Sequence, residues 1–359
     1  MDKKIGIVTL YGLYNYGNRL QNYAIHKLMQ DLGFDSVTLV CLKSRAWHVA
    51  QNIFRIWNTL IRKPEYQRRT AFLKFVKRTT PVRYIYSREM RIPDSVSEEF
   101  IGFFTGSDQV WNPEIRVNEK YNYFLRFAPA NKRFSISPSF GVSAIPEKFV
   151  KEYSEWLSEF RFLSCREAEG AEIVKKLTGK DAQVLIDPTM MLNRDEWKKI
   201  YEDISVPNQP YMLLYFLGDI SDDRRGIINK IANENKLLVI DVLNKNETKY
   251  MNMQPDGLLQ MIDNAALVCT DSFHVAAFSI NFNIPFYVFS RHQKETFGNR
   301  MLSRIENLLS LFGLSERLNP KTIEHALQCD FSYANDIIEI ERQKERNYLL
   351  KCLEACQTK

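Results

Sequence analysis

The chain has 359 residues, of which 45% are hydrophobic and 26% are charged, and its formal net charge at pH 7 is +6. This composition is typical of a soluble globular protein, and the length predicts two domains of about 150–200 residues each. The apolar runs fall short of the ~18–20 residues that a membrane-spanning helix requires, so an integral membrane protein is not expected.

The cysteines and the first residues narrow the class of protein further. Cysteines stand at positions 41, 165, 269, 329, 352 and 356, without the paired spacing of a metal site. Three of them fall in apolar strand patterns, where a thiol behaves as a small hydrophobic group. Residues 1–10 contain too short an apolar run for a signal peptide, and no small-residue cleavage site follows. We therefore expect a cytoplasmic protein without disulfide bonds or a bound metal.

Residues 4–32 have the pattern of a strand, a loop and a helix. Residues 4–10 predict a short strand, and apolar residues recur at helical spacing over 19–32. The loop between them, 11–18, is polar and aromatic and contains Gly12 and Gly17. A hairpin turn is the alternative, but a doubly wound domain would bind its ligand at such a loop. Residues 37–42 predict the next strand.

A strongly basic segment, residues 43–91, interrupts this alternation. It contains 13 lysine or arginine residues and only two acidic residues, Glu65 and Glu89. Apolar residues recur at steps of three to four from Trp47 to Ile61, which predicts an amphipathic helix. Such a segment suits a membrane surface, a lipid-linked acceptor or an acidic polymer; a solvated outer face is the alternative. No nucleic-acid-binding module is recognisable, so we expect no nucleic-acid partner.

Polar motifs follow the next two strand patterns. Residues 99–104 lead into Gly-Ser-Asp-Gln at 106–109, which places short hydrogen-bonding side chains at the mouth of the sheet. Trp111 offers a face on which a sugar could stack, whereas Asp108 could be a helix N-cap or a turn residue instead. Residues 134–140 predict another strand, which Gly141 follows, and a helical pattern runs from 145 to 160.

Residues 161–188 complete the first half of the chain. A short strand at 161–167 presents Arg166, whose planar guanidinium suits bidentate contact with a phosphate or a carboxylate. Surface pairing with Glu167 or Glu169 is the alternative. Residues 183–186 end in Asp187-Pro188, and because proline disfavours helix at the residue before it, we place the domain boundary there.

The second half alternates more regularly between strand and helix. Strand patterns at 211–217, 236–241, 265–270 and 285–289 are separated by helical patterns that begin after 222, after 255, at 273 and at 300. This alternation predicts a parallel sheet with helices on both faces. Residues 326–359 are charged and helical in pattern.

The strand-to-helix junction at 270–274 is the strongest candidate for a catalytic site. Asp271 or Ser272 is a good N-cap, and the first helical turn leaves backbone N–H groups that can bind an anion at the carboxyl end of the strand. His274 in that turn could donate a proton to the bound anion. The alternative is a structural histidine, which is the commoner case for a single His.

Six motifs, taken in order, resemble those of the polysaccharide pyruvyl transferase family. They are Asn15-Tyr-Gly-Asn-x-x-Gln-Asn-Tyr-Ala24, Gly106-Ser-Asp-Gln-Val-Trp-Asn112, Ser139-Phe-Gly141, Ser164-Cys-Arg-Glu167, Asp187-Pro-Thr189 and Thr270-Asp-Ser-Phe-His274, and the Ser303-Arg-Ile305 helix also fits. The resemblance spans most of residues 5–315. It implies an α/β architecture with two Rossmann-like, doubly wound domains that face a cleft, as in GT-B glycosyltransferases. Val275, where the family often has glycine, and Pro138, where a small residue is usual, depart from the pattern.

The resemblance also implies an activity, which is transfer of a pyruvyl group from phosphoenolpyruvate to hydroxyls of a glycan or lipid-linked saccharide, with ketal formation and phosphate release. No metal or further cofactor is required. Residues 189–359 would bind the donor and residues 1–188 the acceptor. His274 would be catalytic, the donor-binding residues would be Arg166, Ser272, Phe273 and Arg304, and the acceptor-side residues would be Asn15, Tyr16, Gly17, Asn18, Gln21, Ser107, Asp108, Gln109 and Trp111.

Two other functions stay open at this point. A GT-B glycosyltransferase that uses a nucleotide sugar would have the same architecture with another donor. A non-catalytic protein that binds a glycan or a membrane surface would depend mainly on the basic segment. For either enzyme, we expect peripheral contact of residues 43–91 with the inner face of the membrane.

Overall fold

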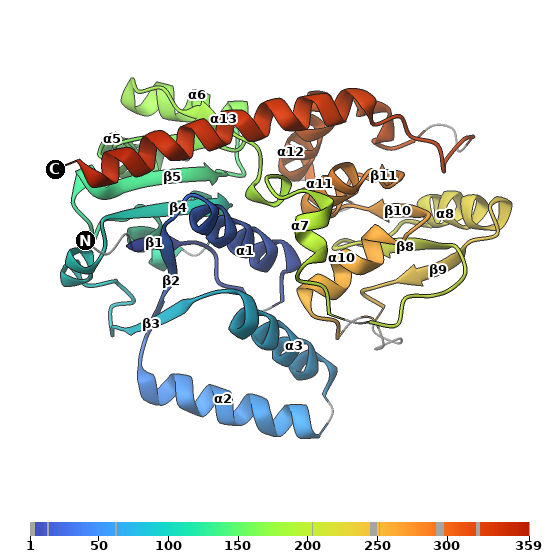
Figure 1. Cartoon of the computed structure of the whole chain (residues 1–359), viewed down its shortest axis with the longest axis horizontal. Helices are drawn as coiled ribbons and strands as arrows, with labels where there is room; N and C mark the ends of the chain where they lie inside the picture. The colour runs from blue at the N-terminus through green and yellow to red at the C-terminus, as the bar shows by residue number, and fades with distance from the viewer. Residues whose placement is uncertain are drawn as a thin grey trace. The chain divides into compact units, whose positions relative to one another are not determined.

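The computed structural model describes residues 4–358 except 13, 62, 116, 203, 245–249, 251, 292–297 and 321–323. The chain divides into two units: unit 1 contains Met1–Met191 and Glu341–Lys359, and unit 2 contains Leu192–Ile340. Strands and helices alternate along the chain in both units, as predicted (Figure 1).

Unit 1 is built on a five-stranded parallel sheet with the strand order β3-β2-β1-β4-β5. Its elements are β1 (Lys4–Val8), α1 (Tyr16–Asp31), β2 (Asp35–Leu42), α2 (Arg45–Leu60), α3 (Pro64–Thr79), β3 (Val82–Tyr86), β4 (Gly102–Asp108), α4 (Lys120–Tyr123), β5 (Arg133–Pro138), α5 (Glu147–Ser158), β6 (Ser164–Cys165), α6 (Ala168–Thr178) and β7 (Gln183–Val184). The strands β6 and β7 pair with each other in a small second sheet. From β1 the chain builds outward to β3 and then returns to β4 on the other side of β1, so the strand order reverses between β1 and β4.

Burial of both faces explains the apolar runs of the central strands. Every residue of β4 and of β5 is buried, as expected inside a parallel sheet. Beyond the end of β4, the ring of Trp111 packs on Phe124, Phe140 and Phe160, with ring centroids 5.2–5.7 Å apart. Trp111 is completely buried. The prediction that its face stacks on a sugar is therefore wrong, because neighbouring aromatic rings already cover it.

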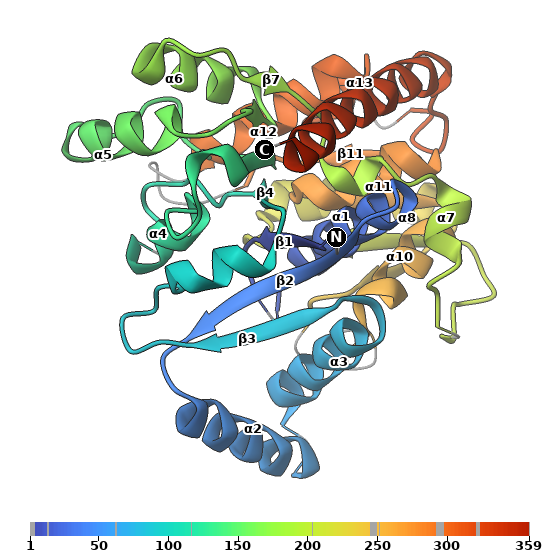
Figure 2. The same ribbon diagram turned by 60° about the vertical axis from the view of Figure 1, so that its left-hand side comes forward.

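The basic segment contains more structure than the single helix that we predicted. Helix α2 is followed by α3 and by the edge strand β3, which pairs parallel with β2. Helix α3 packs on α1, and α2 lies outside α3 in both views (Figures 1 and 2). Four of the five residues of 82–86 are aromatic or β-branched, which is typical of a strand, but the surrounding positive charge concealed this pattern.

Unit 2 has a four-stranded parallel sheet with the strand order β11-β10-β8-β9. Its elements are α7 (Arg194–Lys198), β8 (Tyr211–Tyr215), α8 (Asp222–Glu234), β9 (Leu238–Asp241), α10 (Pro255–Asp263), β10 (Leu267–Thr270), α11 (Phe273–Phe282), β11 (Phe286–Val288) and α12 (Gly298–Leu311). The strands and the parallel sheet predicted for this half are confirmed. Strand β9 lies on one side of β8 and β10 lies on the other, so the order reverses between β8 and β10.

The last helix, α13 (Ser332–Gln357), begins in unit 2, and its residues from Glu341 onward belong to unit 1. There Leu349 and Leu353 are buried, and the Tyr348 hydroxyl donates a hydrogen bond to the carbonyl oxygen of Ser135 at 2.8 Å. Assigning all of 189–359 to one domain was therefore wrong for residues 341–359. The helical pattern shows that α13 has an apolar face but not which core covers it.

Candidate functional site

The two reversals of strand order indicate where each sheet can bind a ligand. In open parallel α/β sheets, ligands bind outside the carboxyl ends of the two strands between which the order reverses. These strands are β1 and β4 in unit 1, and β8 and β10 in unit 2. Five of the six sequence motifs lie in unit 1, and the Thr270–His274 motif lies in unit 2.

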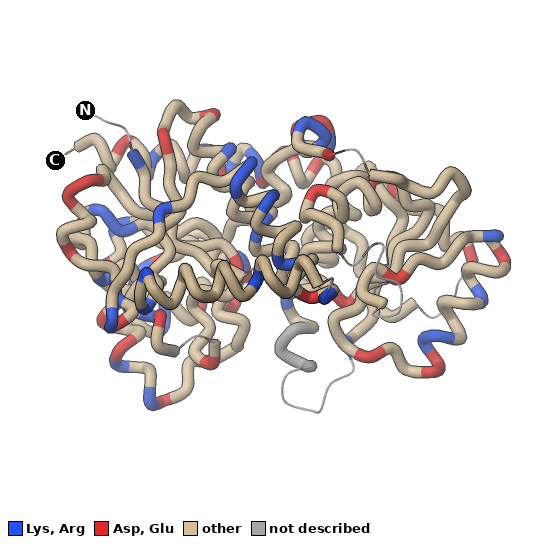
Figure 3. The backbone as a smooth tube through the Cα atoms, turned by 90° about the horizontal axis from the view of Figure 1, so that it is seen from below, with Lys and Arg blue, Asp and Glu red and all other residues tan. Residues whose placement is uncertain are grey.

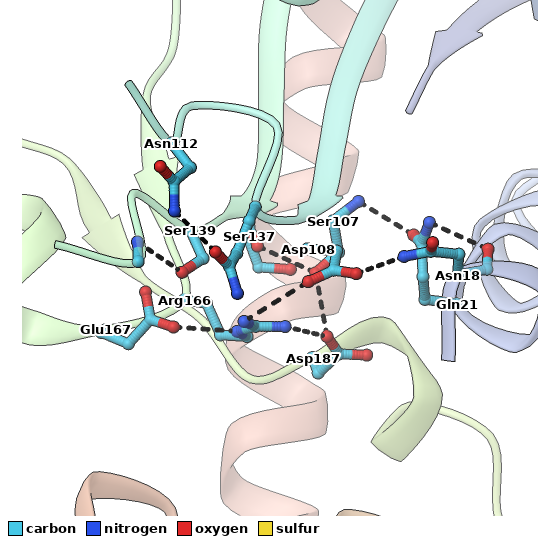
Figure 4. A network of polar contacts seen from close by, with 12 residues as sticks. Asn18, Gln21, Ser107, Asp108, Asn112, Ser137, Ser139, Arg166, Glu167 and Asp187 are labelled. Atoms are coloured by element: carbon cyan, nitrogen blue, oxygen red, sulfur yellow. Dashed lines mark hydrogen bonds and ion pairs between the residues drawn. The ribbon is translucent and has the colours of Figure 1, made fainter. Parts of the chain in front are cut away.

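A buried polar network ties α1 to the carboxyl ends of β1 and β4 (Figure 4). The side-chain amide of Gln21 donates to Thr9 Oγ1 at 2.7 Å, and its oxygen accepts from the backbone N–H of Ser107 at 2.9 Å. The side-chain amide of Asn18 donates to the carboxylate of Asp108. The first two motifs of the sequence therefore meet in direct hydrogen bonds.

Arg166 joins the Ser164–Glu167 and Asp187–Thr189 motifs to this network (Figure 4). Its Nη1 donates to Asp187 Oδ2 at 2.9 Å and its Nε donates to Glu167 Oε1 at 3.0 Å, while Nη2 lies 3.9 Å from Asp108 Oδ1. Ser107 Oγ lies 3.0 Å from the same Asp187 oxygen. Burial alone would lower the pKa of the Arg166 guanidinium, but the carboxylates of Glu167, Asp187 and Asp108 raise it above its ordinary value. The guanidinium thus supplies the positive charge that three buried carboxylates need.

A further carboxyl group, that of Glu345 on α13, is fully buried near Asp187. Burial raises the pKa of Glu345 well above its ordinary range, and the negative charge of Asp187 adds to the shift. Among the described residues, neither carboxyl oxygen of Glu345 has a hydrogen-bond partner. The surroundings therefore favour the neutral, protonated form of Glu345.

The acceptor-side residues that the sequence predicted divide into a buried set and an accessible set. Gln21 and Ser107 are completely buried, so their side chains support the site from within. Tyr16 is buried at the start of α1, where its ring packs on Phe72, and Gly17, Asn18 and Asp108 are buried as well. Asn15 is exposed, with its Oδ1 accepting from the backbone N–H of Asn18, and Gln109 is half-buried, with its Oε1 accepting from the Asn112 amide at 2.7 Å.

Gly106 permits the close approach of β4 to β5 beneath this network. Its φ is +123°, and a Cβ atom added there would lie 2.1 Å from the carbonyl oxygen of Ile136.

We expect Gly106→Ala to lower the free energy of unfolding by about 3 kcal/mol, because strain and overlap each cost about 1–3 kcal/mol. Chemical denaturation measures the change. The control is Gly226→Ala in α8, where an added Cβ has no neighbour within 4 Å and should stabilise the helix by about 0.5–1 kcal/mol. Equal stability of the two variants would contradict the role of Gly106.

A pocket of about 480 Å³ opens in unit 1 at the carboxyl ends of β1 and β2. Its lining includes the aromatic residues Tyr11, Trp47 and Tyr123 and the charged residues Lys43 and Glu119. The volume falls within the range of about 300–1,000 Å³ that is usual for small-molecule sites. Tyr11 belongs to the loop that we expected to meet a ligand, and Lys43 and Trp47 belong to the start of the basic segment. Glu119 and Tyr123 come from a third segment, and no local pattern indicates that the three segments meet.

In unit 2, β10 gives way to α11 at the junction that the sequence predicted. The carboxylate of Asp271 accepts hydrogen bonds from the backbone N–H groups of Leu217 at 2.7 Å and Gly218 at 2.8 Å, and it pairs with Arg291 Nε at 3.0 Å. Asp271 therefore ties the carboxyl ends of β8 and β10 together. Ser272 occupies the N-cap position, and its side chain makes no capping hydrogen bond within the described part of the chain.

His274 is half-buried in the first turn of α11. Its ring lies edge-on to the ring of Phe273, with the centroids 5.5 Å apart. Arg304 is buried on α12, which packs against α11. A helix N-terminus that carries an imidazole combines backbone N–H groups for an anion with a proton donor. Ser272, Phe273, His274 and Arg304 thus share unit 2, whereas Arg166 lies in unit 1.

These features define an α/β protein of the GT-B fold, with two Rossmann-like units and with polar motifs at the strand reversal of each unit. The chain belongs to the polysaccharide pyruvyl transferase family, whose sequence model matches residues 15–293. It is therefore a transferase that acts on polysaccharide.

Solved structures resemble the chain in fold. A protein of Listeria monocytogenes described as a UDP-N-acetylglucosamine 2-epimerase is 10% identical with a TM-score of 0.50, and the match covers 97% of this chain and 95% of that one. The UDP-GlcNAc 2-epimerase of Neisseria meningitidis bound to UDP-GlcNAc is 9% identical with a TM-score of 0.47, over 97% of this chain and 100% of that one. At these identities the likeness concerns the fold alone. The search of curated proteins returns no match.

Proposed function

We propose that the protein transfers a pyruvyl group from phosphoenolpyruvate to two hydroxyls of a saccharide, forming a cyclic ketal and releasing phosphate. Membership of the polysaccharide pyruvyl transferase family supports this reaction. The observation that carries it is the position of His274, a half-buried imidazole in the first turn of α11, whose N-terminus lies at the strand reversal of unit 2.

Unit 2 offers a group for each part of the donor chemistry. Phosphoenolpyruvate carries a phosphate and a carboxylate, which the N–H groups of the first turn of α11 and the guanidinium of Arg304 would bind. His274 donates a proton to the methylene carbon, and C2 becomes electrophilic. One acceptor hydroxyl attacks C2, and the second displaces phosphate and closes the ketal. Of the two hydroxyl protons, one restores the imidazolium and the other leaves with the phosphate.

The pocket of unit 1 is the proposed binding site of the acceptor. Aromatic rings such as those of Tyr11 and Trp47 present apolar faces to the C–H groups of a sugar ring, and the charged ends of Lys43 and Glu119 suit its hydroxyls. Asn15 and Gln109 remain as further candidate contacts from the sequence motifs. The acceptor is a glycan or a lipid-linked saccharide.

The identity of the donor is the first point to test. We expect phosphoenolpyruvate to raise the midpoint of thermal unfolding, because a ligand at 100 times its Kd stabilises the native state by about 2.7 kcal/mol. UDP at the same concentration should leave the midpoint unchanged. Stabilisation by UDP and not by phosphoenolpyruvate would establish a nucleotide-sugar glycosyltransferase instead. If neither compound binds, the proposed donor site is wrong and a non-catalytic glycan-binding role gains support.

A further inference from the structure

Helix α2 exposes its apolar face, whereas an amphipathic helix of a globular protein usually buries that face against the core. Its large apolar residues are all exposed, by 49% to 72% of their surface. They are Trp47, Val49, Ile53, Phe54, Ile56, Trp57 and Leu60, and Ile61 at the C-cap continues the set. At 100° per residue these positions lie on one half of the helix, so they form a continuous apolar surface that we call the α2 face. Scattered exposed apolar residues are ordinary, but a contiguous surface of this kind marks an interaction site.

The polar half of α2 explains this orientation, because it is the half that packs on the protein. Arg55 Nη1 donates to Thr70 Oγ1 of α3 at 2.8 Å, and the hydroxyls of Thr59 and Thr70 lie 2.9 Å apart. Asn58 is buried on the same side, and its amide donates to the carbonyl oxygen of Phe54 at 2.7 Å. Hydrogen bonds with α3 therefore hold the helix in place and turn the α2 face outward.

The charge around the α2 face selects its occupant. Helix α2 contains no acidic residue (Figure 3). Lys43 and Arg45 at its start and Lys63 after its end are exposed, as are several basic residues of α3. Over residues 43–91 the basic residues outnumber the acidic ones by 13 to 2. A second copy of this surface would bring like charges together, whereas an anionic lipid surface complements both the apolar face and the basic border.

We propose that the α2 face docks on an anionic lipid bilayer, with α2 lying in the plane of the interface. Among the described residues, no helix has both the length and the apolar character needed to span a membrane. In-plane helices of this type bury their apolar face to a depth of about 5–10 Å, and adjacent Lys and Arg side chains bind anionic headgroups. The chain thus contacts the membrane through one helix and keeps the sheet of unit 1 in water.

Trp47 links this surface to the pocket of unit 1. The residue lies in the first turn of α2, at one end of the α2 face, and it also lines the pocket. Docking would therefore place the opening of the pocket near the lipid headgroups. If the acceptor proposed above is bound there, it would be one whose saccharide is attached to a lipid.

Vesicle binding of the full chain tests the docking, and it is measured without donor or acceptor, so a failure of the proposed activity would not affect it. We expect co-sedimentation with vesicles that contain phosphatidylglycerol and much weaker binding to phosphatidylcholine alone. Binding should weaken as salt rises from about 0.1 to about 1 M, since the Debye length falls from about 10 to about 3 Å. Leu60→Gln, at the most exposed position of the α2 face, should weaken binding about tenfold.

Ile340→Gln is the matched control, because Ile340 is 61% exposed on α13 and is not one of the residues of the α2 face, so its replacement should leave vesicle binding unchanged. Failure to bind anionic vesicles, or equal binding by Leu60→Gln and wild type, would overturn the proposal. So would light scattering that finds a dimer in the wild-type protein and a monomer in Leu60→Gln, because the α2 face would then be an interface between two copies.

Discussion

Replacing His274 by alanine is expected to lower the rate of phosphate release from phosphoenolpyruvate about 10²- to 10⁴-fold, the usual contribution of general acid catalysis. In the proposed reaction the imidazole protonates the methylene carbon. Alanine has no proton to donate, so water would have to supply it. Binding of the donor should change far less, because Arg304 and the backbone N–H groups of α11 remain in place. The measurement is kcat and KM for phosphate release in the presence of a saccharide acceptor.

His325→Asn provides the control for this variant. His325 is exposed in unit 2 and has a φ of 58°, a conformation that asparagine tolerates better than most residues. This variant should release phosphate at the wild-type rate. If His274→Ala is as active as the wild type and equally stable, His274 has no part in the reaction and the structural interpretation of this histidine is correct.

Arg166→Met is expected to lower the free energy of unfolding by about 3–5 kcal/mol, the usual cost of removing one partner from a buried ion pair. Methionine fills part of the volume of arginine but leaves Asp187 and Glu167 buried without a cation. The effect should be visible in urea denaturation followed by far-UV circular dichroism.

Arg83→Met is the matched control, since Arg83 pairs with Glu99 at 2.6 Å on the surface of the same unit. Exposed ion pairs contribute about 0–1 kcal/mol, so this variant should be nearly as stable as the wild type. The comparison also distinguishes a role of Arg166 in stabilising the buried network from a role in binding phosphoenolpyruvate. If Arg166→Met stays as stable as Arg83→Met and raises KM for phosphoenolpyruvate, then Arg166 binds the donor and the network does not depend on it.

Local pattern was sufficient to predict most of the secondary structure. The strands of unit 2 and the junction at Thr270–His274 appear in the sequence as apolar runs followed by helical spacing, because strand and helix repeat over only a few residues. The same reasoning missed α3 and β3, where positive charge obscured the pattern. It also missed the docking of α13 on unit 1, since periodicity identifies an apolar face without identifying its partner.

The candidate site could be predicted only in parts. Polar motifs after successive strands indicated where ligands bind, because the carboxyl ends of parallel strands share one edge of a sheet. The direct contact of Asn18 with Asp108, and of Arg166 with Asp187, depends on strand order and on loops, which pairings between distant segments determine. The pocket between β1, β2 and α2 has the same origin, and its lining residues therefore carried no common signal in the sequence.

The amino-acid order alone establishes an α/β chain with polar residues at the ends of its strands and with His274 in the first turn of a helix, because each of these features depends on neighbours a few residues away. Tertiary packing determines which of these side chains are buried and which helix faces stay exposed. It buries Trp111 and Arg166, which the sequence suggested as ligand contacts, and it turns the apolar half of α2 outward. A pattern of apolar residues specifies that a face is apolar, but only the surfaces brought against it by long-range contacts decide whether that face is covered.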